Sequence, residues 1–217
     1  MKIYAFGMSA PSRFVMAVCK HVNIPFEPVD VDLTSQEQKS EAHVKRNPNG
    51  KVPVMEEGDF TLFESLAIVR YLLDSKVPGN TLFPTDPKTR AKINQVLVGL
   101  NDLRGGQFVV TAGKVILPRM GKSMPDQILH HAEEQYKGAL AKINGLLEGK
   151  TFAVGDHATI VDFLFAEVIM NAAMIKTNFD DYPNIKKYYE HLLATIPELK
   201  EDAENVKDII EMLSGSQ

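Results

Sequence analysis

Residues 47–71 contain side chains and backbone groups whose types and spacing could bind a short peptide-like ligand. Pro53 lies inside a strand-like run, residues 52–55, and proline cannot donate to a sheet ladder, so this run belongs at an edge or a bulge. The neighbouring Val52 then keeps a free N–H and C=O for pairing with an extended peptide. Ser65 begins a helix-like run, where unpaired amides and the helix dipole favour a carboxylate. The same pattern also fits an ordinary β-hairpin followed by a helix start.

Two runs in this region, NPNGKVP (residues 47–53) and DFTLFESLAIVRYL (residues 59–72), resemble the glutathione-binding half of the cytosolic glutathione transferases. The sequences of these motifs resemble those of the serine-using phi, theta and delta-like classes, and they are most similar to phi. This resemblance implies that the bond between Val52 and Pro53 is cis, and that Val52 pairs through its backbone with the cysteinyl part of glutathione. It also implies that Glu64 and Ser65 hold the γ-glutamyl end.

The residues expected at the glycine end of glutathione match the family less closely. Lys39 corresponds to a lysine that the phi type points at the glycine carboxylate, whereas Gln38 stands where that class often has histidine. Lys51 stands where the pattern often has glutamine, and it could reach the same carboxylate. Both lysines are also residues that any solvated loop carries. Asn49 replaces an aromatic residue that keys one subunit into the other in some classes, although the resemblance still implies a homodimer.

The turn GMSAPSRF (residues 7–14) is similar to the catalytic loop of the serine-type transferases, which makes Ser9 the expected catalytic residue. A thiol with a pKa of about 8.5 is mostly protonated at neutral pH, and the thiolate is the nucleophile. A hydroxyl that donates to sulfur stabilises the charged form, as do a helix N-terminus and the nearby Arg13. Lowering the pKa by about two units requires about 2.7 kcal/mol of differential stabilisation. Ser9 is therefore expected to act as a hydrogen-bond donor.

Other roles and other candidates remain open in this region. Ser9 could be a plain N-cap ahead of Pro11, and Ser12 is a weaker candidate for the chemistry. Tyr4 lies in the first strand, where other classes of the family keep a catalytic tyrosine, but here its ring is expected in the core or the wall. The thiol-transfer classes carry a cysteine where Ser9 stands. Cys19 is instead expected in mid-helix as a buried small hydrophobe.

The second substrate is expected between the two domains, over the thiol. The expected walls are Met8 and one face of a long helix, where Phe108, Thr111 and Val115 share a line at i, i+3 and i+7. Such residues can equally belong to the core.

Hydrophobic spacing divides the chain into an α/β thioredoxin-like domain (residues 1–75), a linker (residues 76–87) and an all-α domain (residues 88–217). The first domain is predicted to follow the order β-α-β-α-β-β-α. Its elements are strands at residues 2–6, 26–33, 52–55 and 60–63, helices at about residues 11–21 and from residue 65, and a short irregular helix within residues 34–46.

The second domain is predicted to contain helices that begin near residues 86, 125, 159 and 183 and a last helix that reaches residue 213. Gly105-Gly106 is expected to interrupt or bend the first of these. The third is Ala- and Met-rich, runs to about residue 174 and is expected to be buried all round. The run VGDHATIVDF (residues 154–163) resembles the buried capping motif of the transferase helical domain.

Composition excludes several other classes of protein. The net charge of −4, without a basic run, argues against nucleic acid and against an anionic membrane surface. Neither a signal peptide nor an apolar run long enough to span a bilayer is recognised, so a cytoplasmic location is expected. The single cysteine excludes an internal disulfide and any multi-cysteine metal site. His130-His131 with Glu133-Glu134 is expected to be a solvated surface rather than a metal site.

The resemblance implies a glutathione transferase that activates the glutathione thiol and conjugates it to hydrophobic electrophiles, as in detoxification. Glutathione is expected as co-substrate, and no cofactor is expected. One alternative is a glutathione-dependent isomerase or peroxidase on the same site. Another is a non-catalytic transferase-like interaction domain, which Ser9, Glu64 and Ser65 together argue against.

Overall fold

The first part of the chain forms a four-stranded sheet flanked by helices. The structure is a computed structural model, and it describes residues 1–215. The strands lie in the order β2-β1-β3-β4, with β1 parallel to β2 and antiparallel to β3. This order confirms the predicted α/β part of the fold. Its elements are β1 (Lys2–Ala5), α1 (Ala10–His21), β2 (Glu27–Asp30), η1 (Glu37–Lys39), α2 (Glu41–Arg46), β3 (Val54–Glu57), β4 (Phe60–Phe63) and α3 (Ser65–Lys76).

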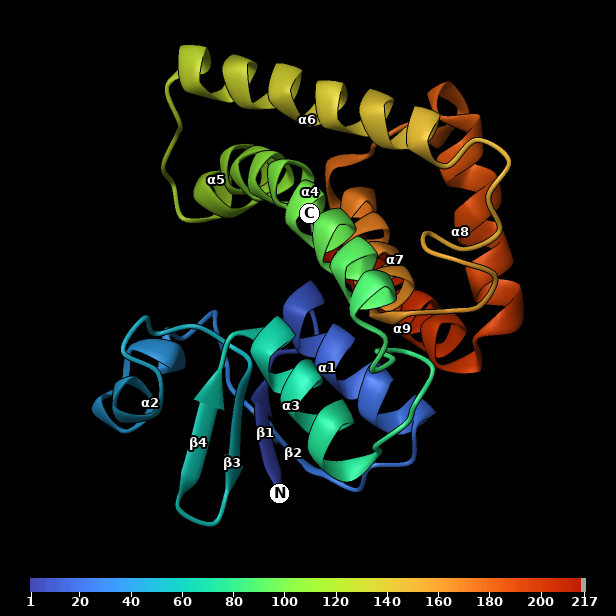
Figure 1. The fold of residues 1–217 in the computed structure, drawn as a ribbon. Helices are drawn as coiled ribbons and strands as arrows, with labels where there is room; N and C mark the ends of the chain where they lie inside the picture. Colours follow the sequence, from blue (N-terminus) through green and yellow to red (C-terminus); the bar gives the residue numbers. More distant parts are fainter. Residues whose placement is uncertain (216–217) are drawn as a thin grey trace.

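The rest of the described chain is helical, as predicted. Helices α1 and α3 lie side by side next to the sheet, and α4 crosses above them alongside α6 (Figure 1). The elements are α4 (Pro87–Thr111), η2 (Ala112–Ile116), α5 (Leu117–Arg119), α6 (Asp126–Leu146), α7 (Ile160–Ala172), η3 (Ala173–Ile175), η4 (Phe179–Asp181), α8 (Pro183–Thr195) and α9 (Pro197–Gly215).

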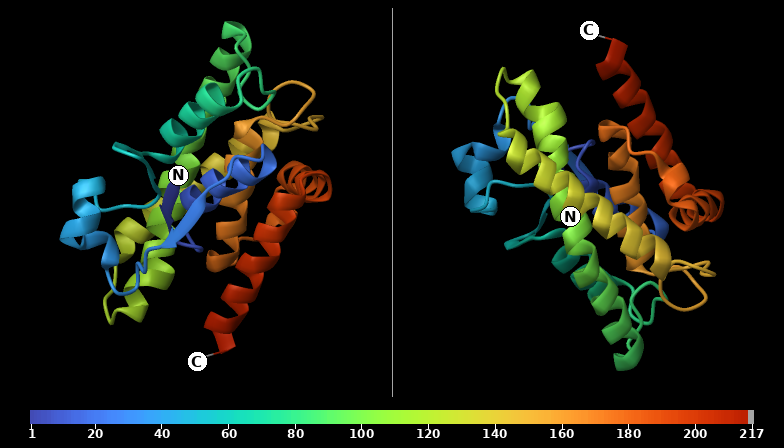
Figure 2. Two further views of the ribbon diagram at one scale, coloured as in Figure 1. Left: turned by 90° about the horizontal axis from the view of Figure 1, so that it is seen from below. Right: turned by 90° about the horizontal axis from the view of Figure 1, so that it is seen from above.

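Helix α7 is the centre of the helical layer. All of its residues except Asn171 are buried, as expected for an apolar helix without a polar face. Helix α1 packs directly on α7, so the first helix of the sheet layer also contributes to the helical layer. Helix α9 runs along the side of α7 and continues past it (Figure 2). The two layers therefore share one core, because the predicted hydrophobic faces of α1 and α7 meet.

The start of α7 is fixed by the predicted capping motif. The Asp162 carboxylate accepts hydrogen bonds from the backbone N–H of Thr159 at 2.7 Å and of Ala153 at 2.8 Å. The Tyr188 hydroxyl donates to the same carboxylate. A buried carboxylate is tolerated where its lone pairs are satisfied by donors in this way. The motif therefore closes the loop before α7 and ties α8 to it.

Several predicted boundaries differ from the structure. Gly105-Gly106 was predicted to interrupt or bend the first long helix; it does not interrupt it, because α4 is continuous from Pro87 to Thr111. A Cβ added to Gly106 would lie 3.2 Å from the backbone of Tyr136, so this glycine permits close contact between α4 and α6. The departure from α-helical geometry comes later, in the π-helical turn η2. Strand β3 also begins after Pro53, because proline lacks the N–H that a ladder needs.

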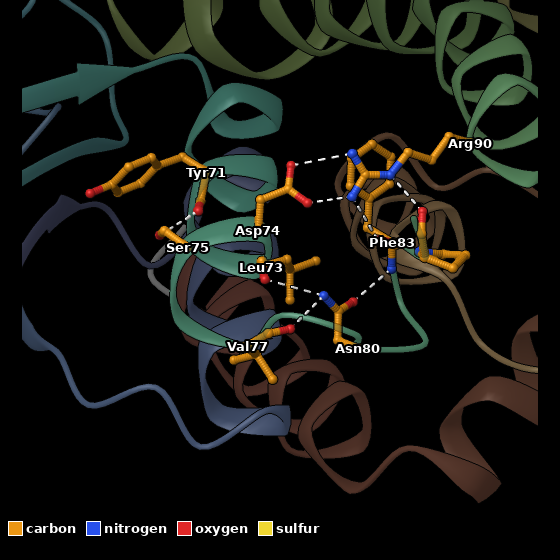
Figure 3. Close-up of polar contacts among 9 residues, drawn as sticks. Tyr71, Leu73, Asp74, Ser75, Val77, Asn80, Phe83 and Arg90 are labelled. Carbon is orange, nitrogen blue, oxygen red and sulfur yellow. Dashed lines mark hydrogen bonds and ion pairs between the residues drawn. The ribbon is translucent and has the colours of Figure 1, made fainter. Parts of the chain in front are cut away.

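The connection between α3 and α4 is held by its own hydrogen bonds (Figure 3). Asn80 donates to the carbonyl of Leu73 at 3.2 Å, and its Oδ1 accepts from the backbone N–H of Phe83 at 2.8 Å. Arg90, near the start of α4, pairs with Asp74 of α3 and donates to the carbonyl of Phe83 at 3.2 Å. The guanidinium also lies 4.2 Å from the ring centroid of Phe83. These contacts fix the direction in which α4 leaves the sheet layer.

Candidate active site

The register of the sheet brings three separate parts of the chain to one end. Val54 pairs with Tyr4 on one side and with Phe63 on the other. Because both pairings are antiparallel, the chain leaves β1, enters β3 and leaves β4 at the same end of the sheet. These three segments contain Ser9, the Val52-Pro53 pair and the Glu64-Ser65 pair. The structure thus gathers residues that lie as far apart in the sequence as Ser9 and Ser65.

Ser9 is the N-cap of α1. Its backbone is extended, with φ −84° and ψ 108°, and its Oγ accepts a hydrogen bond from the backbone N–H of Ser12 at 3.4 Å. The Ser9 side chain is half-buried. Since Oγ uses a lone pair for this capping bond, the hydroxyl hydrogen stays available for a ligand at the helix N-terminus.

Of the other hydroxyl candidates, one is sealed in the interior and one is engaged with a carboxylate. Ser12 is fully buried, and its Oγ accepts from the backbone N–H of Phe6 at 3.4 Å. The Tyr4 hydroxyl donates to Oε2 of Glu56 at 2.8 Å, and the Arg46 guanidinium lies 4.3 Å from the centroid of its ring. Burial and the hydrogen bond to Glu56 raise the pKa of Tyr4. Both hydroxyls therefore contribute to the local structure of the sheet layer.

Cys19 lies in the middle of α1 and is fully buried. Burial raises the pKa of its thiol to about 12. A thiol that remains protonated is a poor nucleophile. Cys19 therefore acts as a small apolar side chain of the core, which is the role that the sequence predicted.

The segment before β3 presents an unpaired backbone. The peptide bond between Val52 and Pro53 is cis, as the resemblance implied. Among residues 1–215, the N–H and C=O of Val52 have no hydrogen-bond partner. The preceding carbonyl, of Lys51, is held by Asn47 Nδ2 at 2.9 Å and lies 3.0 Å from His43 Nε2. The chain is thus fixed immediately before Val52 and open at Val52 itself.

Glu64 and Ser65 form the start of α3 and approach the second layer. Glu64 has a φ of +71°, which is rare for a residue other than glycine, and such conformations cluster at binding sites. Ser65 is the first residue of α3 and is buried. Arg104 of α4 faces Glu64; burial lowers the pKa of Arg104, while the charge of Glu64 opposes this shift. Sequence reasoning missed Arg104, because one arginine on a long helix carries no local signal of this electrostatic interaction.

The expected glycine-end residues lie in η1 and in the loop before β3. A Cβ added to Gly50 would lie 2.8 Å from Nζ of Lys39 and 2.9 Å from the carbonyl oxygen of Gln38. Lys39 is exposed, and its Nζ donates to the carbonyl of Asn49 at 3.3 Å. Gln38 is half-buried, and its Oε1 is buried without a partner in the part of the chain that the structure describes. Lys51 is exposed beside them.

Comparison with known proteins agrees with this geometry. The family models for the N-terminal and C-terminal domains of glutathione S-transferase match residues 1–74 and 108–195. A glutathione S-transferase from Hyoscyamus muticus is 30% identical over 203 residues, covering 89% of this chain and 93% of that protein. Glutathione S-transferase D6 from Drosophila melanogaster is 25% identical, covering 99% and 97%. The chain belongs to the glutathione S-transferase family.

The fold of this glutathione transferase also agrees with that of solved relatives. The structure of human glutathione transferase theta-2, solved in complex with glutathione, superposes with a TM-score of 0.89 at 25% identity. It covers 100% of this chain and 91% of that one. The prediction of a glutathione transferase fold and activity is thereby confirmed.

The residues expected around the second substrate differ in exposure and in the type of helix that carries them. Met8 and Thr111 are half-buried, whereas 68% of the Phe108 surface is exposed. Val115 lies in η2, beyond the end of α4, so it does not continue the line of Phe108 and Thr111 at regular α-helical spacing. A separate cavity of about 370 Å³ lies among α7, α8 and α9, and none of these four residues lines it.

The His130-His131 pair of the transferase lies on the surface of the helical layer. His130 and His131 are exposed on α6, and Glu133 pairs with Lys114 at 2.5 Å. Among the described residues, no three or more His, Cys, Asp or Glu side chains gather as they would around a metal ion. Within residues 1–215, no helix is both long and apolar enough to cross a membrane.

Proposed function

We propose that this transferase binds glutathione in an extended conformation along Val52 and conjugates its thiolate to a hydrophobic electrophile, with Ser9 as the hydrogen-bond donor to sulfur. The observation that carries this proposal is the convergence of three groups at one end of the sheet. They are the free hydroxyl hydrogen at the N-cap of α1, the unpaired backbone of Val52 and the N-terminus of α3. Glutathione has a peptide backbone, a central thiol and two carboxylates to match them.

In this proposal, each part of glutathione meets a group of suitable chemistry. The cysteinyl backbone pairs with Val52 next to Pro53, as in the addition of a strand. The γ-glutamyl carboxylate meets Ser65 and the amides at the start of α3, while its ammonium group meets Glu64. The glycine carboxylate is held by Lys39 and Lys51 with the Gln38 amide beside them. The sulfur then lies over the loop that carries Ser9.

The thiol is activated without a base. The Ser9 hydroxyl donates to the sulfur, and the N-terminus of α1 stabilises the negative charge, so the thiol releases its proton to solvent water at a lower pH. A shift of about two units requires about 2.7 kcal/mol, which one hydrogen bond to a charged group and a helix dipole can supply. The thiolate attacks the electrophile, a carbon–sulfur bond forms and the leaving group departs with its electron pair. No cofactor enters this step.

The electrophile binds between the two domains, and two copies of the chain assemble. Residues 1–75 bind glutathione, residues 76–87 form the linker and residues 88–217 supply the apolar side of the site, with Met8, Phe108, Thr111 and Val115 around the electrophile. The enzyme acts as a cytoplasmic homodimer.

The test compares Ser9→Ala with Ser35→Ala, which changes an exposed serine on another loop. Retention on immobilised glutathione and turnover of a chlorinated aromatic electrophile are measured for both variants. Ser9→Ala is expected to lose turnover by roughly a hundredfold with little loss of retention, and Ser35→Ala is expected to match the unmodified protein. Unchanged turnover in Ser9→Ala would overturn the role of Ser9. Retention without any turnover in the unmodified protein would favour a binding module. Substrates for isomerase and peroxidase activity are assayed in the same panel, to test for a glutathione-dependent isomerase or peroxidase.

A further inference from the structure

A buried ion pair lies directly behind the loop that carries Ser9. Arg13 of α1 and Glu167 of α7 have side chains that are 3% and 0% exposed, and Arg13 Nε lies 2.6 Å from Glu167 Oε2. Arg13 is therefore turned into the interior and does not face the sulfur, contrary to the expectation that it stabilises the thiolate directly. A pair this deeply buried is costly to desolvate and persists only with excellent geometry and further hydrogen bonds.

The remaining nitrogens of Arg13 hold the catalytic loop. Nη1 donates to the carbonyl of Gly7 at 2.8 Å, and Nη2 donates to Oδ1 of Asn171 at 2.8 Å. Gly7 lies two residues before Ser9, in the turn between β1 and α1. The guanidinium thus connects α7 to the backbone that sets the position of the Ser9 hydroxyl.

Only one oxygen of the Glu167 carboxylate accepts a hydrogen bond from the Arg13 side chain. Its second oxygen, Oε1, is buried and has no donor within the described part of the chain. The carboxyl of Asp202 on α9 lies within hydrogen-bonding reach of Glu167, and Asp202 is 7% exposed. Two carboxylates in contact cannot both be ionised at low cost, because one positive charge, Arg13, cannot compensate two negative ones. A proton shared by the two carboxyls would supply a donor of the kind that Oε1 lacks.

The surroundings favour a retained proton. Burial raises the pKa of Glu167 to about 8, although the charge of Arg13 opposes the shift, and burial also raises the pKa of Asp202. Among the described residues, three other ionisable groups interact electrostatically with the pair: Tyr189 of α8, Lys20 of α1 and Glu201 of α9. Burial raises the pKa of Tyr189, so it stays neutral. Lys20 Nζ lies 2.9 Å from Glu201 Oε1 on the surface, so the charges of these two side chains largely cancel at the pair.

We propose that Glu167 and Asp202 share one proton and act together, through Arg13, as positioning residues for the loop that carries Ser9. The connection runs from Asp202 on α9 through Glu167 on α7 and Arg13 on α1 to the carbonyl of Gly7. This inference rests on the proposed role of Ser9 in catalysis. Loss of the shared proton puts two negative charges in contact, so that Glu167 is displaced and the Ser9 loop loses its support.

The first experiment detects the proton without turnover. Infrared spectroscopy of the unmodified protein is expected to show the C=O band of a protonated carboxyl at neutral pH, although ordinary carboxyls are ionised there. The band is expected to disappear as the pH rises through the titration of the pair. It is expected to be absent at neutral pH in Asp202→Asn and to persist in Glu201→Gln, which changes an exposed neighbour on α9. Absence of the band from the unmodified protein would overturn the shared proton.

The second experiment measures kcat/KM against pH with saturating electrophile. Asp202→Asn keeps a permanent donor for Glu167 Oε1, so it is expected to keep near-normal activity at neutral pH and to lose the alkaline decline that the pair causes. The ratio of its kcat/KM to that of the unmodified protein is expected to rise by up to about tenfold per pH unit above the ionisation. Asp202→Ala, which has no donor, is expected to lower kcat already at neutral pH while KM for glutathione changes less. Identical pH profiles for Asp202→Asn and the unmodified protein would overturn the positioning role.

The two proposals fail separately. If Ser9→Ala leaves turnover unchanged while the infrared band behaves as expected, the catalytic role of Ser9 is wrong and the shared proton stands. If Ser9→Ala abolishes turnover and the pH profiles coincide, the role of Ser9 stands and the positioning role of the pair is wrong.

Discussion

Arg13 Nε lies 2.6 Å from Glu167 Oε2 in a contact that contains almost no exposed surface. This pair joins the helix that follows the Ser9 loop to the most deeply buried helix of the molecule. Single changes that remove one partner leave the other charge buried without compensation, which makes the pair a site where stability and catalytic geometry are linked.

Replacement of Arg13 by Met is expected to lower the free energy of unfolding by about 3 kcal/mol, at the lower end of the range for breaking a buried pair because Glu167 can take up a proton. The measurement is urea denaturation at pH 7. The matched control is Lys20→Met, which breaks the exposed pair with Glu201 at 2.9 Å and is expected to cost less than about 1 kcal/mol. Equal losses for the two variants would show that burial of the Arg13 pair has no energetic consequence.

The stability of the protein should depend on pH through Glu167 and Asp202. Folding raises the pKa of Glu167 from 4.5 to about 8, so between these values the folded state binds more protons than the unfolded state. The sign of the linkage is then negative: this contribution to the free energy of unfolding is fully present below about pH 4.5 and is lost as the pH rises towards 8. Asp202→Asn is expected to flatten this slope in unfolding curves taken across that interval. An unchanged slope would contradict the assignment of the raised pKa to this pair.

Arg104 is expected to support glutathione binding through Glu64. Arg104→Leu removes the positive charge that faces the carboxylate, so KM for glutathione is expected to rise by about fivefold, corresponding to about 1 kcal/mol, while kcat changes less. Arg104→Lys keeps the charge and is expected to recover part of the loss. Lys92→Leu, at an exposed position of the same helix, is the control. If Arg104→Leu raises KM for glutathione no more than Lys92→Leu does, Arg104 does not support glutathione binding.

The adjacent glycines of α4 offer a paired test of packing. A Cβ at Gly106 would lie 3.2 Å from the backbone of Tyr136, whereas a Cβ at Gly105 would meet nothing within 4 Å. Gly106→Ala is expected to lower the free energy of unfolding by about 1–3 kcal/mol through overpacking. Gly105→Ala is expected to raise it by about 0.5–1 kcal/mol, because alanine is the better helix former. Thermal or urea unfolding of both variants checks the prediction, and the same sign for both would contradict it.

Local spacing was sufficient for most of the fold. The strand and helix order of the first 76 residues, the N-caps at Ser9 and Thr159 and the burial of α7 all follow from patterns within about ten residues of each position. The motif around Val52 and Pro53 could also be recognised from the sequence, because its residues lie close together along the chain. The length of β3 was predicted incorrectly. Pro53 belongs to an apolar run in the sequence, but it lacks the N–H that pairing with a neighbouring strand requires, so the strand begins after it.

The sequence by itself determined most of the elements and their order, because hydrophobic period, capping residues and turn residues act over short distances. The family followed from the resemblance of whole motifs, such as the runs at residues 47–53 and 59–72. Tertiary structure alone decided which residues meet across the layers. Gly106 accommodates Tyr136 thirty positions away, Arg104 faces Glu64, and Arg13 pairs with Glu167 over a separation of 154 residues. A glycine, an arginine or a carboxylate on a helix has the same local pattern whether it faces water or a partner. Packing of the helices removes the water and thereby gives each of these residues its role.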